Sequence, residues 1–270
     1  MTDRSCPPRV LTVAGSDSGG GAGIQADLKT IHGWGCFGMS AITALTAQNS
    51  LGVGGVYKVT GAFVAEQIEA VLGDIGADAV KCGMLADAEV IGAVAGALSR
   101  YPEPPLVLDT VLIAQSGDPL LEDDPVEVMV DKLFPRALLI TPNADEAERL
   151  TGIEVTGVDA MREAGRKLRE MGAAGVLVKG GHVPGERLTD LLLLPDGGER
   201  VFTGPRIDTD HTHGSGCTLA SGIAAGLALG MELADAVAAG REYLRRGISK
   251  AHRTGKGYGT MLHEPFRPEV

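Results

Sequence analysis

The chain has 270 residues, enough for one large domain or two small ones. With 24 Lys and Arg against 35 Asp and Glu, its net charge is −11, which argues against a general nucleic-acid-binding protein. The four cysteines are far apart and include no C-x-x-C pair, which argues against a zinc site or a disulfide framework. We see no apolar core of a signal peptide in residues 1–9 and no membrane span, so we expect a cytoplasmic protein that does not bind membranes.

Hydrophobic periodicity predicts strands and helices that alternate along the chain. In chain order these are strand 10–14, helix 24–32, strands 39–47 and 55–59, helix 63–72, strand 79–81, helix 87–98, strand 106–108, helix 126–133, strand 138–140, helices 144–150 and 159–171, strand 175–178, an antiparallel pair of strands 188–194 and 199–203, and helices 216–229 and 233–252. This order predicts an α/β fold with a mostly parallel central sheet and helices on both faces. No linker or change in composition divides the chain.

Polar side chains follow or end several of the predicted strands, namely Asp17, Gln48, Asp109, Asn143 and Lys179. In open α/β sheets the ligand binds beyond the carboxyl ends of the strands. We therefore expect these five side chains to lie together in one site.

The stretch 208–222 runs from a polar loop, through Gly214-Ser215-Gly216, into an apolar segment with helical spacing. Glycines let the backbone approach a ligand closely, and the first amides of a helix point at it with the positive end of the helix dipole behind them. Cys217 lies at this helix start, where a thiol can have a lowered pKa. One hypothesis is an anion hole for phosphoryl transfer beside a thiolate base, and the alternative is a glycine-rich turn followed by a core cysteine. The nearby His211 and His213 are expected to be structural or orienting rather than metal ligands.

Residues 15–23 form a second glycine-rich segment, and residues 21–26 fit the dinucleotide pattern G-x-G-x-x-A. The turn is long, however, and no acidic residue follows at the distance needed to hold a ribose. No G-K-[ST] is present either, so the segment is not a P-loop. We prefer a loop that wraps a small substrate, with a solvent-exposed turn as the alternative.

Four further residues have a structural and a functional interpretation to weigh. Gln48 offers a donor and an acceptor that match the edge of an aminopyrimidine, or it bonds to loop backbone. Asn143 can cap the helix that follows, and Glu146 can complete a capping box or hold Mg²⁺ through water near nucleotide phosphates. Lys179 can neutralise a phosphate or be a solvated lysine at the end of a strand.

Taken in order, these motifs resemble the ribokinase superfamily, and within it the hydroxymethylpyrimidine/phosphomethylpyrimidine kinases of thiamine biosynthesis. The resemblance runs nearly end to end and rests on residues 14–17, 20–29, 43–49, 83–84, 108–111, 116–121, 141–143 with Glu146, 179–182 and 212–217. It implies one three-layer α/β/α ribokinase-like domain over residues 1–270, in a homodimer that uses ATP and Mg²⁺. It also implies two successive phosphorylations, first of the hydroxymethyl group of an aminopyrimidine and then of the resulting monophosphate.

The resemblance also implies roles for single residues. The substrate-binding set would be Gly15, Asp27, Gln48, Met84 and Val111; the nucleotide-binding set Asn143, Lys179 and Thr212; the metal ligands Asp109 and Glu146; and the catalytic set Gly214, Ser215, Gly216 and Cys217. Cys217 takes the place where many members of the superfamily carry an aspartate base. Because the second phosphorylation starts from an ionised phosphate, it should need that base less.

The chain departs from the family pattern at three positions: His211 replaces a common Asn, Ser215 a common Thr and Arg241 a substrate-side Lys. Arg keeps the charge but changes the geometry, so the role of Arg241 stays open. The main alternative function is a pyridoxal kinase of the same fold. A nicotinamide-dependent oxidoreductase and a non-catalytic binding module are further alternatives.

Overall fold

The computed structural model describes residues 6–111, 123–181, 183 and 185–268. Its elements are β1 Arg9–Asp17, α1 Gly23–Gly33, β2 Phe37–Asn49, β3 Gly52–Lys58, α2 Gly61–Asp74, β4 Ala79–Cys82, α3 Ala88–Leu98, β5 Leu106–Leu108, α4 Asp123–Lys132, the 3₁₀ helix η1 Phe134–Arg136, β6 Leu139–Ile140, α5 Ala144–Thr151, α6 Val158–Glu170, β7 Gly175–Val178, β8 Arg187–Leu193, β9 Glu199–Pro205, α7 Ser215–Ala228 and α8 Leu233–Ser249. The predicted motif 116–121 lies outside the described residues.

One sheet holds all nine of these strands, in the order β3-β2-β1-β4-β5-β6-β7-β8-β9. The strands from β2 through β1 and β4 to β7 pair in parallel, whereas β3, β8 and β9 pair antiparallel at the two edges. The predicted antiparallel pair is the β8–β9 hairpin. The mostly parallel α/β sheet predicted from the sequence is confirmed.

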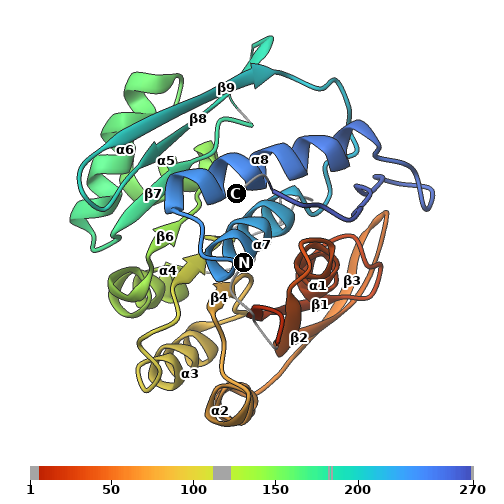
Figure 1. The fold of residues 1–270 in the computed structure, drawn as a ribbon, viewed down its shortest axis with the longest axis vertical. Helices are drawn as coiled ribbons and strands as arrows, with labels where there is room; N and C mark the ends of the chain where they lie inside the picture. Colours follow the sequence, from red (N-terminus) through yellow and green to blue (C-terminus); the bar gives the residue numbers. More distant parts are fainter. Residues whose placement is uncertain (1–5, 112–122, 182, 184, 269–270) are drawn as a thin grey trace.

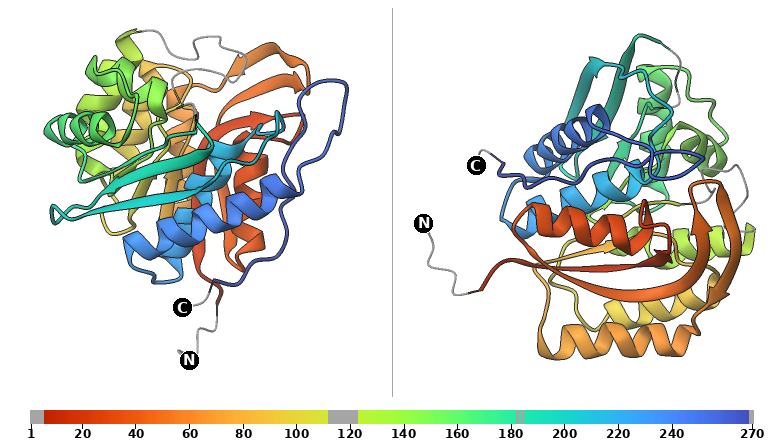
Figure 2. Two further views of the ribbon diagram at one scale, coloured as in Figure 1. Left: turned by 90° about the horizontal axis from the view of Figure 1, so that it is seen from above. Right: turned by 90° about the vertical axis from the view of Figure 1, so that its right-hand side faces the viewer.

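Helices cover both faces of the sheet (Figure 1), which explains why its central strands are almost wholly apolar. Successive strand residues point to opposite faces, so Val10 and Leu11 belong to two different core clusters, as do Leu106 and Val107. One cluster packs against α2 to α6, and the other packs against α1, α7 and α8. The right-hand view of Figure 2 shows blue α7 and α8 with red α1 on one side, and orange α2 on the other. These three layers give the expected α/β/α fold.

The chain reverses its direction of travel across the sheet at β1, which lies between β2 and β4. The loop after β1 leads to α1 on one face, and the loop after β4 leads to α3 on the opposite face. A crevice opens where two such loops separate, and ligands of open α/β sheets bind there. This topology places the segments after β1 and β4 at the edge of one crevice.

Most element boundaries agree with the prediction to within a few residues, and β1 is the informative exception. It continues through Gly15 to Asp17 by means of a shift in register against β2 between Ala14 and Ser16. Part of the predicted loop 15–23 is therefore strand, because an irregularity lets the pairing resume after one position. At the start of α3, Asp87 is the N-cap residue and its carboxylate accepts from Val90 N–H at 3.0 Å.

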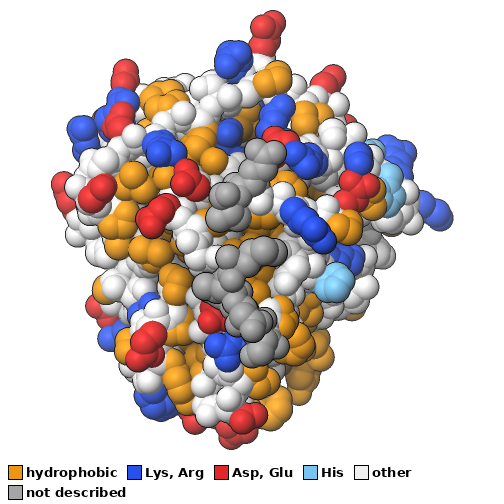
Figure 3. Space-filling view, in the orientation of Figure 1, with side chains coloured by type: hydrophobic (Ala, Val, Ile, Leu, Met, Phe, Trp, Pro, Cys, Tyr) orange, Lys and Arg blue, Asp and Glu red, His pale blue; other side chains and the backbone are white. Residues whose placement is uncertain are grey.

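The surface of the described residues mixes both signs of charge, as Figure 3 shows for the face toward the viewer of Figure 1. Within the described part of the chain, no helix has both the length and the apolar character that crossing a membrane requires.

Candidate active site

A cavity of about 950 Å³ opens at the carboxyl ends of the strands. The polar strand-end residues Asp17, Gln48, Asp109, Asn143 and Lys179 all line it, so the structure brings together the group that the sequence predicted. The other predicted site residues that line it are Gly15, Met84, Val111, Glu146, Thr212, Gly214, Ser215, Gly216 and Cys217. Asp27 is the exception.

The two glycine-rich segments meet backbone to backbone at the start of α7. Gly214 has a left-handed φ of 82°, and a Cβ atom placed there would lie 1.9 Å from the carbonyl oxygen of Gly21. Gly23 is also left-handed, and its Cβ would lie 2.4 Å from the carbonyl oxygen of Gly15. Only glycine fits either position, because a side chain would push the two contacting stretches of backbone apart. The N-terminus of α7 therefore opens directly into the cavity.

Cys217 lies in the first turn of α7 and lines this cavity, with its side chain partly exposed. The sequence led us to expect a lowered thiol pKa, and that expectation is wrong. Burial raises the pKa of Cys217 to about 11, although positive Lys81 and the Gly23 backbone N–H both act to lower it. The desolvation of the thiolate in this crevice outweighs the effects of Lys81 and the Gly23 amide. At neutral pH, Cys217 is therefore mainly a thiol.

Asp27 does not line the cavity, which corrects its assignment as a substrate-binding residue. Its side chain is fully buried, and both carboxylate oxygens lie 2.9 Å from the Nζ atom of Lys81, which is equally buried. Asp27 also accepts hydrogen bonds from Thr12 Oγ1 at 2.6 Å and Ser221 Oγ at 2.7 Å. The amphipathic spacing of α1 could not reveal this, since the partners come from β1, β4 and α7.

Asp17 fixes the turn after β1. Its carboxylate accepts hydrogen bonds from the N–H groups of Gly19, Gly21 and Ala22 at 2.8, 3.0 and 2.8 Å, and lies 3.1 Å from Nε2 of His213. Burial by itself would raise the pKa of Asp17, but His213 and the amides of Ala22 and Gly19 lower it below its usual value. The segment is thus an ordered turn built around one buried carboxylate rather than a freely exposed loop.

Gln48 extends this polar chain into the cavity. Its Nε2 lies 3.3 Å from His213 Nε2, and its Oε1 lies 3.3 Å from Thr46 Oγ1. Thr46 Oγ1 also lies 2.9 Å from the carbonyl oxygen of Ser16, and a hydroxyl has only one hydrogen to donate. Because both contacts of the Gln48 amide are long, a ligand with a matching edge can replace them.

Gly15 and Met84 face each other across the crevice between β1 and β4. A Cβ atom on Gly15 would lie 2.5 Å from the Met84 methyl carbon, so glycine is required for the methionine to adopt this position. Thr43 holds the Met84 backbone through a hydrogen bond from its hydroxyl to the Met84 carbonyl oxygen at 2.7 Å. Val53 and Val56 of β3 add apolar surface to the same end of the cavity.

Asp109 and Lys179 form an ion pair of 3.0 Å on the other side of the α7 N-terminus. Thr141 Oγ1 donates to Asp109 at 2.9 Å. Burial would raise the pKa of Asp109, but Lys179 and Lys81 lower it, and Asp109 in turn raises the pKa of Lys179. Both groups are therefore charged at neutral pH. A Cβ on Gly216 would lie 3.2 Å from Asp109, so this charged pair adjoins the glycine turn.

Asn143 and Glu146 form the predicted capping box at the start of α5. Asn143 Oδ1 accepts from Glu146 N–H at 2.9 Å, and Glu146 Oε2 accepts from Asn143 N–H at 2.8 Å. Thr110 Oγ1 is a further neighbour of Glu146, at 3.3 Å. The structural role of Glu146 is thus present, and Glu146 also lines the cavity that Asp109 lines.

The described residues contain no group of three or more His, Cys, Asp or Glu side chains arranged to hold a metal ion. Mg²⁺ commonly binds through only one or two carboxylates, with waters and phosphates as the other ligands. Asp109 and Glu146 fit that pattern, because both are carboxylates on one cavity wall.

Sequence reasoning missed one wall of the cavity, which contains Leu188, Arg206, Ile207, Leu244 and Ile248. These residues come from β8, the segment after β9, and α8, and no spacing pattern joins them along the chain.

Arg241 also lies on this wall. Its Nε is 2.6 Å from Asp190 Oδ2, and its guanidinium lies 5.1 Å from the centre of the Phe202 ring. Asp190 in turn accepts from the Gly180 N–H at 2.8 Å. Arg241 therefore supports the β7–β8 side of the cavity, away from the crevice between β1 and β4.

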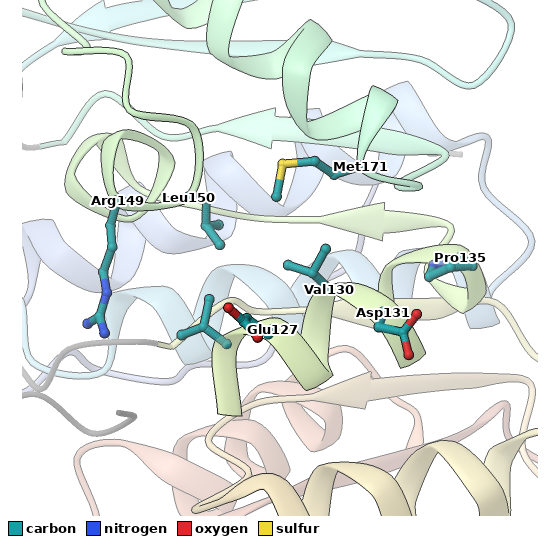
Figure 4. Close-up of a pocket in the computed structure, with 8 residues that line it drawn as sticks. Glu127, Val130, Asp131, Pro135, Arg149, Leu150 and Met171 are labelled. Carbon is teal, nitrogen blue, oxygen red and sulfur yellow. The ribbon is translucent and has the colours of Figure 1, made fainter. Parts of the chain in front are cut away.

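A second, smaller cavity of about 460 Å³ shares no lining residue with the first. Figure 4 shows it between α4 and the ends of α5 and α6, with Val130, Leu150 and Met171 directed toward one another. None of the predicted site residues lies there. The convergence of polar groups, glycine turns and Cys217 singles out the larger cavity as the candidate active site.

Comparison with known proteins agrees with this arrangement. A family model described as phosphomethylpyrimidine kinase matches residues 17–262. The chain is 44% identical over 261 residues to the hydroxymethylpyrimidine/phosphomethylpyrimidine kinase of Bacillus subtilis, covering 96% of each protein. It is 49% identical over 255 residues to the thiamine biosynthesis bifunctional protein ThiED of Geobacter sulfurreducens, covering 94% of this chain and 52% of that protein, so it spans about half of that relative.

Solved structures give the same picture. A phosphomethylpyrimidine kinase from Clostridium difficile superposes with a TM-score of 0.80 at 42% identity, covering 89% of this chain and 99% of the other. The ADP complex of Bacillus subtilis pyridoxal kinase superposes with a TM-score of 0.89 at 33% identity, covering 96% and 98%. The fold is thus the ribokinase-like fold of these vitamin kinases, and the chain belongs to the phosphomethylpyrimidine kinase family.

Proposed function

We propose that the protein phosphorylates 4-amino-5-hydroxymethyl-2-methylpyrimidine with ATP, first to the monophosphate and then to the diphosphate, in thiamine biosynthesis. The observation that carries this proposal is the shared cavity. Gln48 and the α7 N-terminus with Cys217 line one crevice, and Lys179 and Asn143 line its continuation. The shared cavity supports the proposal, because the group proposed to read the pyrimidine, the cradle proposed for the phosphoryl group and the proposed nucleotide site would then follow one path.

The pyrimidine fits the end of the cavity formed by Gly15, Gln48 and Met84, with Val111 beside them. The Gln48 amide can donate to a ring nitrogen and accept from the 4-amino group, in place of its two 3.3 Å contacts. Met84 provides an apolar contact for the ring, and Gly15 leaves room for the Met84 side chain. A bidentate amide contact in a partly dry pocket favours this edge over one that lacks the amino group.

Phosphoryl transfer takes place at the start of α7 in this proposal. The amides of Gly214 and Gly216 lie where charge builds on the transferred group, and the helix dipole supports them. The Ser215 N–H instead donates to the Thr212 carbonyl oxygen at 3.1 Å, so it shapes the turn. The hydroxymethyl proton passes to Cys217 in its thiolate form. With a thiol pKa of about 11, only about one molecule in a thousand carries that thiolate at pH 8. The rate of the first phosphorylation should therefore follow the fraction of Cys217 that is ionised.

The nucleotide lies on the side of Lys179, Asn143 and Thr212, with its base against the apolar wall of Leu188, Ile207 and Ile248. Lys179 neutralises phosphate charge, for which its raised pKa keeps it protonated. Asp109 and Glu146 would hold Mg²⁺, partly through water. When bound, that ion supplies charge compensation between the donor phosphates.

We further propose a homodimer. Apolar side chains are exposed on the edge hairpin β2–β3 and the helix after it: Leu45 46%, Leu51 68%, Tyr57 72% and Phe63 56%. Leu45 and Tyr57 are direct cross-strand neighbours, so they form a continuous surface. A second copy would cover this surface and blunt the exposed edge of β3. Sedimentation of the Tyr57→Asp variant tests the idea, since a monomer is expected from it and a dimer from the parent protein.

The activity is tested by an ATP-consumption assay with the aminopyrimidine alcohol, its monophosphate and pyridoxal side by side. We expect turnover of both pyrimidine substrates. Pyridoxal is included because the structure is similar to that of a pyridoxal kinase. Turnover of pyridoxal alone would overturn the proposed substrate. Gln48→Ala should raise the KM for the pyrimidine far more than the KM for ATP.

A further inference from the structure

Directly beneath the candidate active site lies the buried ion pair of Lys81 and Asp27, which the proposed reaction does not yet use. Neither side chain is exposed, and Lys81 is among the largest fully buried side chains in the described part of the protein. Buried ion pairs are costly to form and are weak evidence of a stabilising role. Their position is therefore the informative feature.

Lys81 lies on β4 and points its ammonium group toward the floor of the cavity. A Cβ atom on Gly83, two residues nearer the carboxyl end of the strand, would lie 2.6 Å from Lys81 Nζ. Gly83 directly precedes Met84, which lines the cavity. The bond from Gly83 N–H to the Val13 carbonyl oxygen, at 2.9 Å, keeps this floor attached to β1.

Asp27 joins the pair to the helix that carries Cys217. Its carboxylate accepts from Ser221 Oγ at 2.7 Å, and Ser221 follows Cys217 by one helical turn on the same face of α7. Thr12 on β1 binds the other oxygen at 2.6 Å. Asp27 on α1 thus connects β1, β4 and α7 at one point below the sulfur.

We propose that the Lys81–Asp27 pair positions Cys217 and sets the charge at its sulfur. In this proposal Lys81 stabilises the thiolate and Asp27 disfavours it. The inference rests on the proposed base role of Cys217. An ammonium has three N–H donors, and among the described residues the contacts of Lys81 Nζ are with the two Asp27 oxygens only. One donor thus remains for negative charge that develops on the cavity side.

Other charges also act on the sulfur. Lys81 and the Gly23 N–H favour the thiolate, whereas Asp27 and Asp109 disfavour it. The negative charge of the thiolate also raises the pKa of Lys179, on the other side of the cavity. Because Lys81 and Asp27 act with opposite signs, removing them one at a time separates an electrostatic role from a merely structural one.

The test is the rate at which iodoacetamide alkylates Cys217 in the intact protein at pH 8, followed by mass spectrometry of the Cys217 peptide. Exposed Cys6 is replaced by Ser in all variants to remove its reaction. Lys81→Met should slow alkylation about tenfold, equivalent to raising the thiol pKa by one unit, and Asp27→Asn should speed it at least threefold. The control Lys250→Met removes an exposed positive charge outside the cavity and should leave the rate unchanged.

Acceleration in both variants would mean that the crevice has opened, and unchanged rates in both would mean that the pair does not act on the sulfur; either result overturns the proposal. If Lys81→Met fails to fold, the double variant Lys81→Met/Asp27→Asn decides, since it must react more slowly than Asp27→Asn alone. Equal or faster reaction would refute the electrostatic role. Failure of the base role is distinguishable, because then Cys217→Ala would keep the first phosphorylation while the opposite alkylation shifts remain.

Discussion

Replacing Gly214 by alanine tests the cradle at the start of α7 most directly. Alanine at a left-handed φ costs about 1–2 kcal/mol, and forcing a methyl group into a packed contact costs about 1–3 kcal/mol more. At Gly214 both apply, because φ is 82° and the added Cβ would lie 1.9 Å from the Gly21 carbonyl oxygen. For a chain of this size, a loss of about 2–5 kcal/mol lowers Tm by about 4–10 °C.

The same clash separates the two glycine segments, so the anion hole should lose its geometry. Loss of one donor of such a hole costs about 10²–10³-fold in kcat. Since both phosphorylations use this hole, we expect Gly214→Ala to slow both steps by similar factors in a coupled assay for ADP release.

Gly152→Ala is the matched control for this experiment. Gly152 has a φ of 74° but nothing within 4 Å of an added Cβ, so it isolates backbone strain from the clash. We expect it to lose about 1–2 kcal/mol with normal activity in both steps. If Gly214→Ala behaved like Gly152→Ala in melting and rate, the close packing of the two loops would not be needed for transfer.

Three further predictions follow from single groups. Cys217→Ala should slow the first phosphorylation at least about 10²-fold and the second much less, and equal losses in both steps would exclude a base role. In the wild-type protein, the rate of the first step should rise about tenfold per pH unit, because the thiol pKa is about 11. Asn143→Ala should lower the free energy of unfolding in urea by about 1 kcal/mol through loss of the α5 cap, whereas Asn143→Asp, which still caps, should not. Burial lowers the pKa of His263 from 6.5 to about 4, so between pH 6.5 and about 4 the unfolded state binds a proton that the folded state does not. The free energy of unfolding should therefore fall as the pH drops through this range, by at most about 1.4 kcal/mol per pH unit. His263→Gln should flatten that part of the stability curve, and an unchanged curve would contradict this assignment.

The local chemistry of the chain was readable from its sequence. Runs of apolar residues such as 175–178 must be buried on both faces, so they predict a parallel sheet covered by helices. The Asn143–Glu146 capping box depends on residues within one turn, so spacing alone identifies it. The strand-end polar residues could likewise be grouped in advance, because parallel strands end at one edge of the sheet.

Interactions between distant segments could not be read in the same way. Asp27 occurs in a motif that suggested substrate contact, yet its partners Lys81 and Ser221 are 54 and 194 residues away and lock it inside the protein. The lowered thiol pKa expected for Cys217 was also wrong, because helix position was visible in the sequence whereas the desolvation of the crevice was not. The cavity wall of Arg206, Leu244 and Ile248 carries no local pattern either. Neighbours along the chain decide the elements, their caps and the end of the sheet where the site lies, so these features could be predicted. Which charges face each other in a dry interior could not be predicted, because burial and charge pairing are set by segments that meet only when the sheet has formed.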